Sequence, residues 1–250
     1  MTDTKPKAKI KLIALDMDGT LLNQYDEVSE ENRKAILEAE NKGVHVVLST
    51  GRAYATCSEY AKSLNLSSYL ITVNGSEIYN EQGKLIEQNI VDTELIQWMW
   101  DLSQSHKTHF WAVSCDHVYR GEMPEDITSS KWLKFGFDSE DDETRDEILR
   151  QLKEKGSLEV SNSSPTNIEV NAVGVNKAKA IEVVCEKLGL TMDEVMAVGD
   201  SLNDIAMIKS AGFGVAMGNA QEIVKETADW VTTTNIEHGV AKAIHKWVLE

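Results

Sequence analysis

The sequence has few cysteines and no long apolar stretch, and both absences limit what the protein can be. The three cysteines, Cys57, Cys115 and Cys185, are far apart and show neither a CxxC pair nor a Cys/His ligand spacing. This pattern argues against a disulfide framework and a zinc site, and it indicates reduced thiols in a cytoplasmic protein. No stretch approaches the roughly 18 apolar residues of a membrane span, and segment 1–11 lacks the apolar part of a signal peptide.

Basic residues are also scarce, since 25 Lys and Arg stand against 41 Asp and Glu, for a formal charge of -16. Nucleic acid and anionic membranes are bound through surplus positive charge, so neither is expected as a partner. A small phosphorylated metabolite remains compatible, because one cation and a few basic side chains can make a positive pocket in an acidic protein. We expect a monomer or a weak homodimer.

The two ends of the chain share one pattern, in which short apolar stretches alternate with helical segments. In the first part we expect a strand just before Asp16, helices at 29–43 and 53–65, and strands at 44–49 and 69–73. In the last part we expect helices at 176–188, 201–209, 220–228 and 236–248, and strands at 195–198 and 213–217. Such alternation implies right-handed crossovers and a covered parallel sheet. The sequence thus predicts an α/β fold with a doubly wound core of residues 1–81 and 176–250.

Residues 82–175 interrupt this pattern and predict an inserted α+β domain. The elements expected in and next to it are a hairpin at 77–88, helices at 93–104 and 141–155, two short strands within 109–120, and strands at 158–161 and 167–171. Two aromatic pairs in the insertion, Trp98 with Trp100 and Phe110 with Trp111, could line a substrate pocket. Aromatic side chains dominate ordinary cores, so we expect them to pack in one.

The stretch IKLIALDMDGTLL at 10–22 places Asp16 and Asp18 where an apolar strand stops at a Gly-Thr turn. Ligands of open α/β sheets bind at the carboxyl ends of the strands. Because the chain begins to turn at Met17, the two acids can converge, and their mutual repulsion then needs compensation. A hard cation such as Mg2+, or a proton retained on one acid, would supply it. An ordinary Asp-Gly turn is the alternative.

Three more polar clusters follow the same logic. The turn Ser49-Thr50-Gly51-Arg52 lies between a strand and the start of a helix, which suits the binding of a phosphate. An ordinary N-cap turn is the alternative interpretation of the same residues. Lys177 stands at a helix start, where its charge opposes the helix dipole, so an anionic partner would explain it. The segment Val198–Asp204 (VGDSLND) adds Asp200, Asn203 and Asp204 after another strand, unless the first acid only caps a helix. All four clusters must lie at one edge of the sheet, and separate helix caps would not explain that.

Together these motifs resemble the haloacid dehalogenase (HAD) superfamily of phosphatases, specifically its Cof-type, class IIB branch. The resemblance is carried by DMDGTLL at 16–22, TGR at 50–52, Lys177, and GDSLND at 199–204. Asn74-Gly75, 215–220 and 239–241 are also similar to this branch, so the likeness spans nearly the whole core. One departure is Ala178, where the branch commonly has Gly after the lysine.

The resemblance implies a HAD-like core with an inserted cap and a magnesium-dependent phosphatase acting through an aspartyl-phosphate. Asp16 would be the nucleophile, and Asp18 would protonate the leaving alcohol and then activate water. Mg2+ would be held by Asp16, the backbone carbonyl of Asp18 and Asp200, with Asp204 in support.

The resemblance also implies which residues hold the phosphoryl group. Thr50, the Gly51 N–H and Lys177 would bind its oxygens, with Arg52 also at the phosphate, and Asn203 would position Lys177 or the substrate. The cap, residues 82–175, would close over the site on hinges near Asn80 and Gly174 and select the leaving group. Substrates of this branch are sugar phosphates, other small phosphorylated metabolites or flavin-related phosphates.

Other functions are compatible with part of the pattern. A phosphosugar mutase shares the first chemical step, and a non-catalytic phosphometabolite-binding regulator would share the phosphate ligands. A glycosyltransferase could use the two acids of DMD at 16–18 with a metal and a nucleotide, but it would leave Lys177 unexplained. Gly212, Gly214 and Gly218 lack the GxGxxG spacing of a dinucleotide loop.

Overall fold

The computed structural model describes residues 6–250, so the first five residues of the N-terminal segment considered above lie outside the described part. Its larger sheet contains β1 (Leu12–Leu15), β2 (His45–Ser49), β3 (Leu70–Thr72), β4 (Glu77–Tyr79), β5 (Leu85–Gln88), β11 (Val195–Gly199), β12 (Phe213–Ala216) and β13 (Trp230–Val231). Its smaller sheet contains β6 (His109–Ser114), β7 (Val118–Arg120), β8 (Trp132–Asp138), β9 (Leu158–Ser161) and β10 (Asn167–Ala172). The helices are α1 (Glu30–Asn41), α2 (Tyr54–Ser63), α3 (Thr93–His106), α4 (Asp142–Lys155), α5 (Lys177–Leu188), α6 (Ile205–Ser210), α7 (Glu222–Thr227) and α8 (Gly239–Ile244). None of the helices in this range is both long and apolar enough to cross a lipid bilayer.

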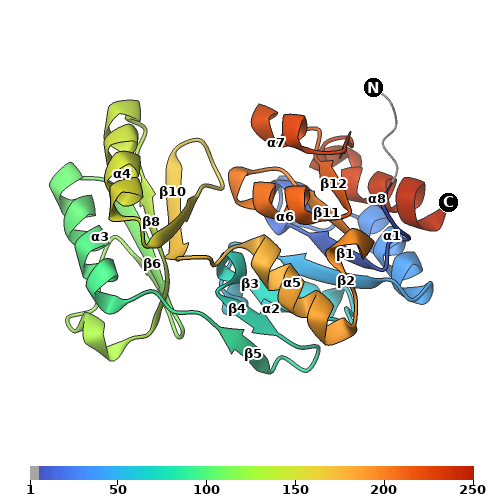
Figure 1. The fold of residues 1–250 in the computed structure, drawn as a ribbon, viewed down its shortest axis with the longest axis horizontal. Coiled ribbons are helices and arrows are strands. Elements are labelled where there is room, and N and C mark those ends of the chain that lie inside the picture. Colours follow the sequence, from blue (N-terminus) through green and yellow to red (C-terminus); the bar gives the residue numbers. More distant parts are fainter. Residues whose placement is uncertain (1–5) are drawn as a thin grey trace.

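The two sheets lie in separate lobes joined by two connections, from β5 to α3 and from β10 to α5 (Figure 1). The larger sheet has the order β13-β12-β11-β1-β2-β3-β4-β5 and forms the core with α1, α2 and α5 to α8. The smaller sheet, of order β7-β6-β8-β10-β9, forms the cap with α3 and α4. This arrangement confirms the predicted α/β class with an α+β insertion.

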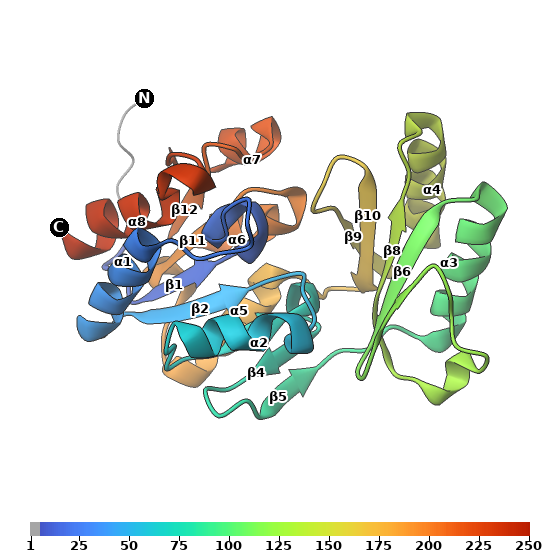
Figure 2. The ribbon, with the colours of Figure 1, turned by 180° about the vertical axis from the view of Figure 1, so that it is seen from behind.

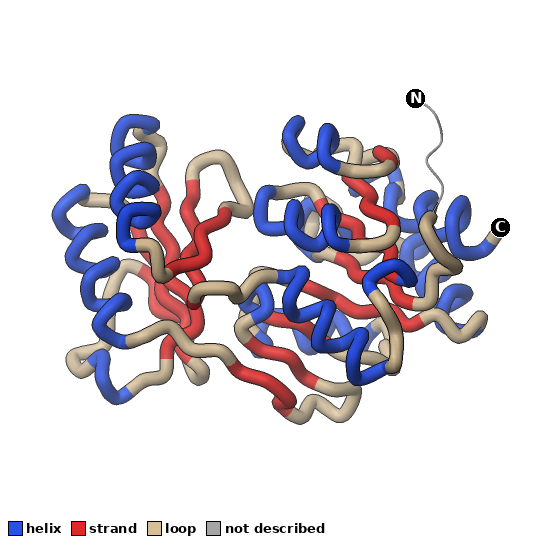
Figure 3. Tube along the Cα trace, in the orientation of Figure 1, coloured by secondary structure: helices blue, strands red, loops and turns tan. Residues whose placement is uncertain are grey.

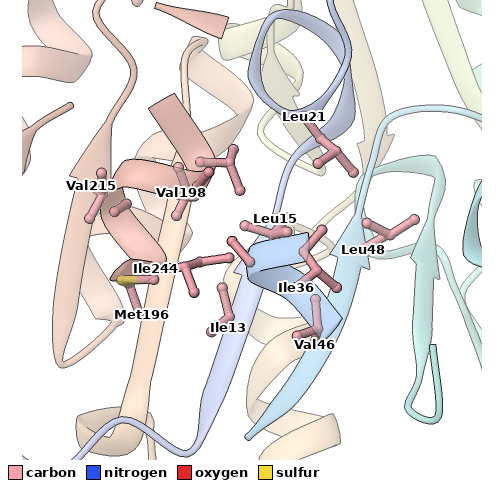
Figure 4. Close-up of a cluster of buried hydrophobic side chains, with 14 of the residues drawn as sticks. Ile13, Leu15, Leu21, Ile36, Val46, Leu48, Met196, Val198, Val215 and Ile244 are labelled. Carbon is pink, nitrogen blue, oxygen red and sulfur yellow. The ribbon is translucent and has the colours of Figure 1, made fainter. Parts of the chain in front are cut away.

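The core sheet is covered on both faces because side chains alternate along its strands. Figure 4 shows Ile13 of β1 and Val46 of β2 on the face that also receives Ile36 of α1 and Ile244 of α8. The opposite face of the same strands packs against α5, which is seen in front of the sheet in Figure 1. The helix α2 lies on the first face and is seen in front of the sheet in Figure 2. From β13 to β3 the strands are parallel, and their carboxyl ends therefore meet at one edge.

Local sequence signals place the helices of the core as expected. The Ser29 hydroxyl accepts a hydrogen bond from the Asn32 N–H at 3.3 Å and caps α1, while Gly43 follows the helix at a φ of 79°. The helix expected at 201–209 is shorter than predicted, because a separate turn at Leu202–Asp204 precedes α6.

Three strands differ from the sequence prediction. The hairpin β4–β5 is present, but β5 pairs with β4 in the core sheet, so that sheet continues beyond residue 81 to Gln88. The predicted division at residues 81 and 175 remains a prediction, and this pairing favours a later start for the cap. Neither β8 nor β13 was predicted. In β8, Lys134 and Gly136 break the apolar run, so the segment lacks the hydrophobic signal of a buried strand.

The cap sheet has one apolar and one polar face. Phe110, Phe135 and Phe137 pack on the side that carries α3 and α4, which lie away from the core (Figure 3). Residues of the opposite parity face the core, because Lys134 of β8 donates a hydrogen bond to the Gly51 carbonyl and Asn74 donates one to Glu169 of β10. The polar face of the cap thus lies over the carboxyl edge of the core sheet.

Candidate active site

A buried lysine joins two of the predicted polar clusters. Lys177, the first residue of α5, has no exposed side-chain surface, and its Nζ donates to Asp16 Oδ1 and to Asp204 Oδ1, both at 2.6 Å. Burial by itself would lower the pKa of Lys177, but the attraction of Asp16 and Asp204 outweighs it and raises the pKa. The anionic partner that its place at the helix start calls for is therefore a pair of carboxylates.

The Asp204 carboxylate fixes the turn that connects β11 to α6 and, with it, the backbone of Asp200. The second oxygen of Asp204, Oδ2, accepts from the backbone N–H groups of Asp200 at 2.9 Å and Ser201 at 3.1 Å. Asp200 in turn accepts from the hydroxyls of Thr20 and Ser201, each at 3.1 Å. Asp204 thus uses both of its oxygens within the protein.

Gly19 allows Asp200 to approach the first motif closely. Its φ is 77°, in the left-handed region, and a Cβ at this position would lie 2.4 Å from Asp200 Oδ2. Any side chain here would displace that carboxylate. The glycine of the first motif therefore brings the β1 and β11 clusters together.

Three carboxylates, those of Asp16, Asp200 and Asp204, offer oxygens that all lie within 4.8 Å of one another. Burial first, and then repulsion from Asp204, raises the pKa of Asp16 well above its usual range and that of Asp200 to about 6. One ammonium group, that of Lys177, opposes three acids, so negative charge remains in excess. A hard divalent cation with oxygen ligands fits this donor set.

Asp18 lies outside this cluster. Its carboxylate is about half exposed and accepts two hydrogen bonds from Arg52, from Nε at 2.8 Å and from Nη2 at 2.5 Å. Arg52 Nη2 also contacts Asp26 Oδ1 at 3.0 Å. The structure thus pairs the first motif with the second through an exposed, bidentate ion pair.

The remaining predicted residues lie around the same point. The buried Thr50 hydroxyl accepts from the Arg52 N–H at 3.1 Å. Asn203 has no hydrogen bond to Lys177 within residues 6–250, since its Nδ2 donates to Asn74 Oδ1 at 3.3 Å. The Oδ1 of Asn203 is buried without a hydrogen-bond partner in the described part of the chain. This leaves Asn203 an acceptor for a group that enters the site.

A cavity of about 520 Å³ lies between the core and the cap. Five predicted residues line it on the core side, namely Asp16, Asp18, Gly51, Arg52 and Asn203. The other four lie next to these: Thr50 is bonded to Arg52, Lys177 to Asp16 and to Asp204, and the oxygens of Asp200 and Asp204 lie within 4.8 Å of Asp16. All nine predicted site residues therefore come together, and the volume is in the range of small-molecule sites.

The sequence did not point to Lys134 and Glu169, which complete the wall of the cavity from the cap. Both are buried, with Lys134 Nζ 3.3 Å from Glu169 Oε1 and 2.8 Å from the Gly51 carbonyl oxygen. Burial raises the pKa of Glu169, but the charge of Lys134 together with the hydrogen bonds from Asn74, Ser163 and Lys134 outweighs burial and lowers the pKa. Asn74 Nδ2 donates to Glu169 Oε2 at 2.6 Å. Their only sequence signal was a charge within an otherwise apolar strand.

The aromatic pairs of the insertion divide between core and cavity. Phe110 is buried in the cap core, and Trp98 and Trp100 pack against it, as predicted. Trp111 packs beside a small cluster of Val73, Val113 and Leu133, but it also lines the cavity. Core packing therefore describes Trp111 only in part.

The fold and this site define a phosphatase with an inserted cap. The chain belongs to the haloacid dehalogenase-like hydrolase family, whose model matches residues 13–135 and 121–244. It is a phosphoric monoester hydrolase of the HAD superfamily that acts on phosphorylated small molecules.

Individual relatives resemble the chain over its whole length. It is 63% identical to 5-amino-6-(5-phospho-D-ribitylamino)uracil phosphatase YcsE of Bacillus subtilis (strain 168), over 100% of both chains. A solved haloacid dehalogenase-like hydrolase from B. subtilis superimposes with a TM-score of 0.87 at 27% identity, covering 94% of this chain and 99% of the other. A solved HAD subclass IIB sugar phosphatase gives a TM-score of 0.85 at 25% identity, covering 96% and 100%.

Proposed function

We propose that this protein is a magnesium-dependent phosphatase that hydrolyses 5-amino-6-(5-phospho-D-ribitylamino)uracil through an aspartyl-phosphate. The substrate is supported by the relative of that name, which is 63% identical over the whole chain. The chemistry is supported by one observation above all: Lys177 holds Asp16 and Asp204 at 2.6 Å directly beneath a cavity that the cap encloses.

Asp16 is the proposed nucleophile. Lys177 fixes its Oδ1, and within residues 6–250 no hydrogen bond occupies Oδ2, which is the atom left to attack phosphorus. In the first step the Asp16 oxygen bonds to phosphorus, the ester bond breaks, and Asp18 gives its proton to the leaving alcohol. In the second step Asp18 takes a proton from water, whose oxygen bonds to phosphorus as the bond to Asp16 breaks. Inorganic phosphate and the free alcohol result.

In this proposal, Asp16, Asp200 and the backbone carbonyl of Asp18 would hold Mg2+. Both oxygens of Asp204 are engaged, so its support is indirect, through Lys177 and the Asp200 backbone. When bound, the cation would neutralise the excess carboxylate charge and the phosphoryl oxygens.

The phosphoryl oxygens would be held by donors of the second and third motifs. Thr50, the Gly51 N–H, Arg52 and Lys177 are the proposed ligands, and their number suits a dianion in a low-dielectric site. Asn203 would accept a hydrogen bond from a substrate hydroxyl. A cytoplasmic location and a monomer or weak homodimer remain predictions, as do hinges near Asn80 and Gly174.

A phosphate-release assay tests this function. The purified protein would be given 5-amino-6-(5-phospho-D-ribitylamino)uracil and a panel of sugar phosphates, each with Mg2+ and with EDTA. Release that requires Mg2+ and is fastest with the ribitylaminouracil ester is expected. An isomerised sugar phosphate in place of inorganic phosphate would identify a mutase. No release from any ester would favour a phosphometabolite-binding regulator.

A further inference from the structure

The indole of Trp111 lies face-down on Gly136. The two residues are register partners on β6 and β8. A Cβ at Gly136 would lie 2.1 Å from Trp111 Cε2, 2.2 Å from Cζ2 and 2.5 Å from Cδ2. Cε2 and Cδ2 are the ring-fusion carbons, which a neighbouring atom reaches together only through the face of the ring. The glycine therefore seats the indole flat against the cap sheet, and its ring forms part of the cavity wall.

Two charged side chains on the same face of the cap sheet also line this wall. Arg120 is the partner of Trp111 on β7, and Asp138 lies two residues beyond Gly136 on β8. Within residues 6–250 neither side chain forms a hydrogen bond or an ion pair; Arg120 is exposed, and Asp138 is partly buried. This part of the wall thus offers a flat aromatic face, a carboxylate acceptor and a guanidinium donor, and all three are available to a ligand.

We propose that Trp111, Asp138 and Arg120 form the subsite for the leaving group, and that they select a planar heterocycle carrying both N–H and carbonyl groups. The ring stacks on Trp111, Asp138 accepts from its N–H or amino groups, and Arg120 donates to its carbonyl oxygens. This inference rests on the proposed function and extends it, since it assigns to named cap residues the recognition of the aminouracil ring.

The wall carries one charge of each sign, which suits a leaving group with both N–H and carbonyl groups. A purely anionic leaving group would pair with Arg120 but leave Asp138 repelled and without a donor. Stacking adds specificity, because a sugar lacks the π face that pairs with an indole. The phosphorylated end is held by the core and the ring by the cap, so the polyol chain between them spans the cavity.

Variants of the aromatic seat separate ring recognition from chemistry. Phosphate release would be measured for the ribitylaminouracil ester and for D-ribitol 5-phosphate, which carries the same phosphorylated chain without the ring. Trp111→Leu should lower kcat/KM for the first substrate by roughly ten- to a hundred-fold, as the loss of one stacked base predicts. For ribitol 5-phosphate, kcat/KM should stay within about two-fold.

Two companion variants guard against a folding defect. Trp111→Phe keeps an aromatic face and should retain most of the preference for the ring. Gly136→Ala leaves Trp111 in the chain but displaces its indole, so it should lose the preference as Trp111→Leu does. Trp98→Phe, on the outer side of the cap, is the matched control and should leave kcat/KM unchanged for both substrates. Thermal unfolding would show which variants are folded.

The same measurements show separately whether the proposed subsite or the proposed function is wrong. Suppose that the wild type prefers the ring-bearing ester. If Trp111→Leu keeps that preference, or lowers kcat/KM equally for both substrates, the proposed subsite is wrong and the proposed function stands. If the wild type releases phosphate only from other esters, the proposed substrate is wrong. Quenching of tryptophan fluorescence by 5-amino-6-ribitylaminouracil, lost in Trp111→Leu, would then still support the subsite, and absence of quenching would overturn it.

Discussion

The guanidinium of Arg52 donates two hydrogen bonds to the carboxylate of Asp18, from Nε to Oδ2 at 2.8 Å and from Nη2 to Oδ1 at 2.5 Å. Arg52 belongs to the turn after β2 and Asp18 to the turn after β1, and both line the cavity. A phosphoryl dianion that enters the cavity would compete with Asp18 for the same donors. Arrival of the substrate would thereby free Asp18 for its proposed acid/base role.

Arg52→Lys should slow the reaction because lysine cannot reproduce the planar two-point contact. Loss of one charge-assisted hydrogen bond corresponds to about 1.5–3 kcal/mol, or roughly ten-fold or more in kcat/KM. Steady-state phosphate release measures it. Arg150→Lys, on the outer helix α4 with partners Glu147 and Glu154, is the matched control. Equal kinetics for the two variants would argue against a role for Arg52 in the site.

Asp16→Asn should abolish turnover while the protein stays folded. The amide is isosteric but cannot form the aspartyl-phosphate, and removal of a nucleophile costs on the order of 10⁴-fold or more. Phosphate release and the far-UV circular dichroism spectrum would be compared with the wild type. Ordinary activity in a folded Asp16→Asn protein would rule out the mechanism.

Lys177→Met should strongly destabilise the protein. It leaves Asp16 and Asp204 buried without their cation, and breaking a buried pair from one side costs about 3–5 kcal/mol. The free energy of unfolding in urea measures this. Lys179→Met, on the same helix with an exposed pair to Glu182, should cost less than about 1 kcal/mol. A similar small loss in both variants would mean that the buried lysine is not needed for stability.

The contribution of Asp200 to the stability of the metal-free protein should fall as pH rises from about 4 to about 6. Burial and Asp204 raise the pKa of Asp200 to about 6, above its ordinary value of 3.8. In this window Asp200 therefore binds more protons in the folded state than in the unfolded state, so its share of the free energy of unfolding falls with rising pH. Asp200→Asn removes this contribution and should weaken the pH dependence in EDTA.

Mg2+ should stabilise the wild type, and it should stabilise Asp200→Asn much less. A cation that binds only the folded state stabilises it by mass action, by about 2.7 kcal/mol at a hundred times its Kd. The thermal midpoint of the wild type at pH 7 should rise with Mg2+, and that of Asp200→Asn should rise much less. Glu222→Gln, an exposed acid on α7, should respond as the wild type does. An identical response in all three would place the cation elsewhere.

The buried pair of Lys134 and Glu169 should behave as a unit that joins cap and core. Lys134→Met removes the partner of a buried carboxylate and the donor to the Gly51 carbonyl, so we expect a loss of about 3–5 kcal/mol. Adding Glu169→Leu should recover part of it, because no charge is then left unpaired. Urea unfolding of both single variants and the double variant gives the coupling, and strict additivity would contradict it.

The sequence by itself determined the α/β core, the inserted α+β unit and the residues of the core side of the site. Strand and helix signals are local, and parallel strands must bring the ends of β1, β2 and β11 to one edge. Asp16, Thr50, Lys177 and Asp200 could therefore be grouped before any coordinates were known. The family resemblance, later confirmed, rested on these same positions.

Only the tertiary structure decided how the cap completes the site. The sequence did not predict β8, because Lys134 and Gly136 interrupt its apolar pattern, although its polar side is buried against the core. The contact of Asn74 with Glu169 joins residues 95 positions apart, and no spacing rule relates them. Trp111 gained its place in the cavity wall from its register opposite a glycine. Such contacts depend on strand register and on the packing of one lobe against the other, which local patterns do not encode.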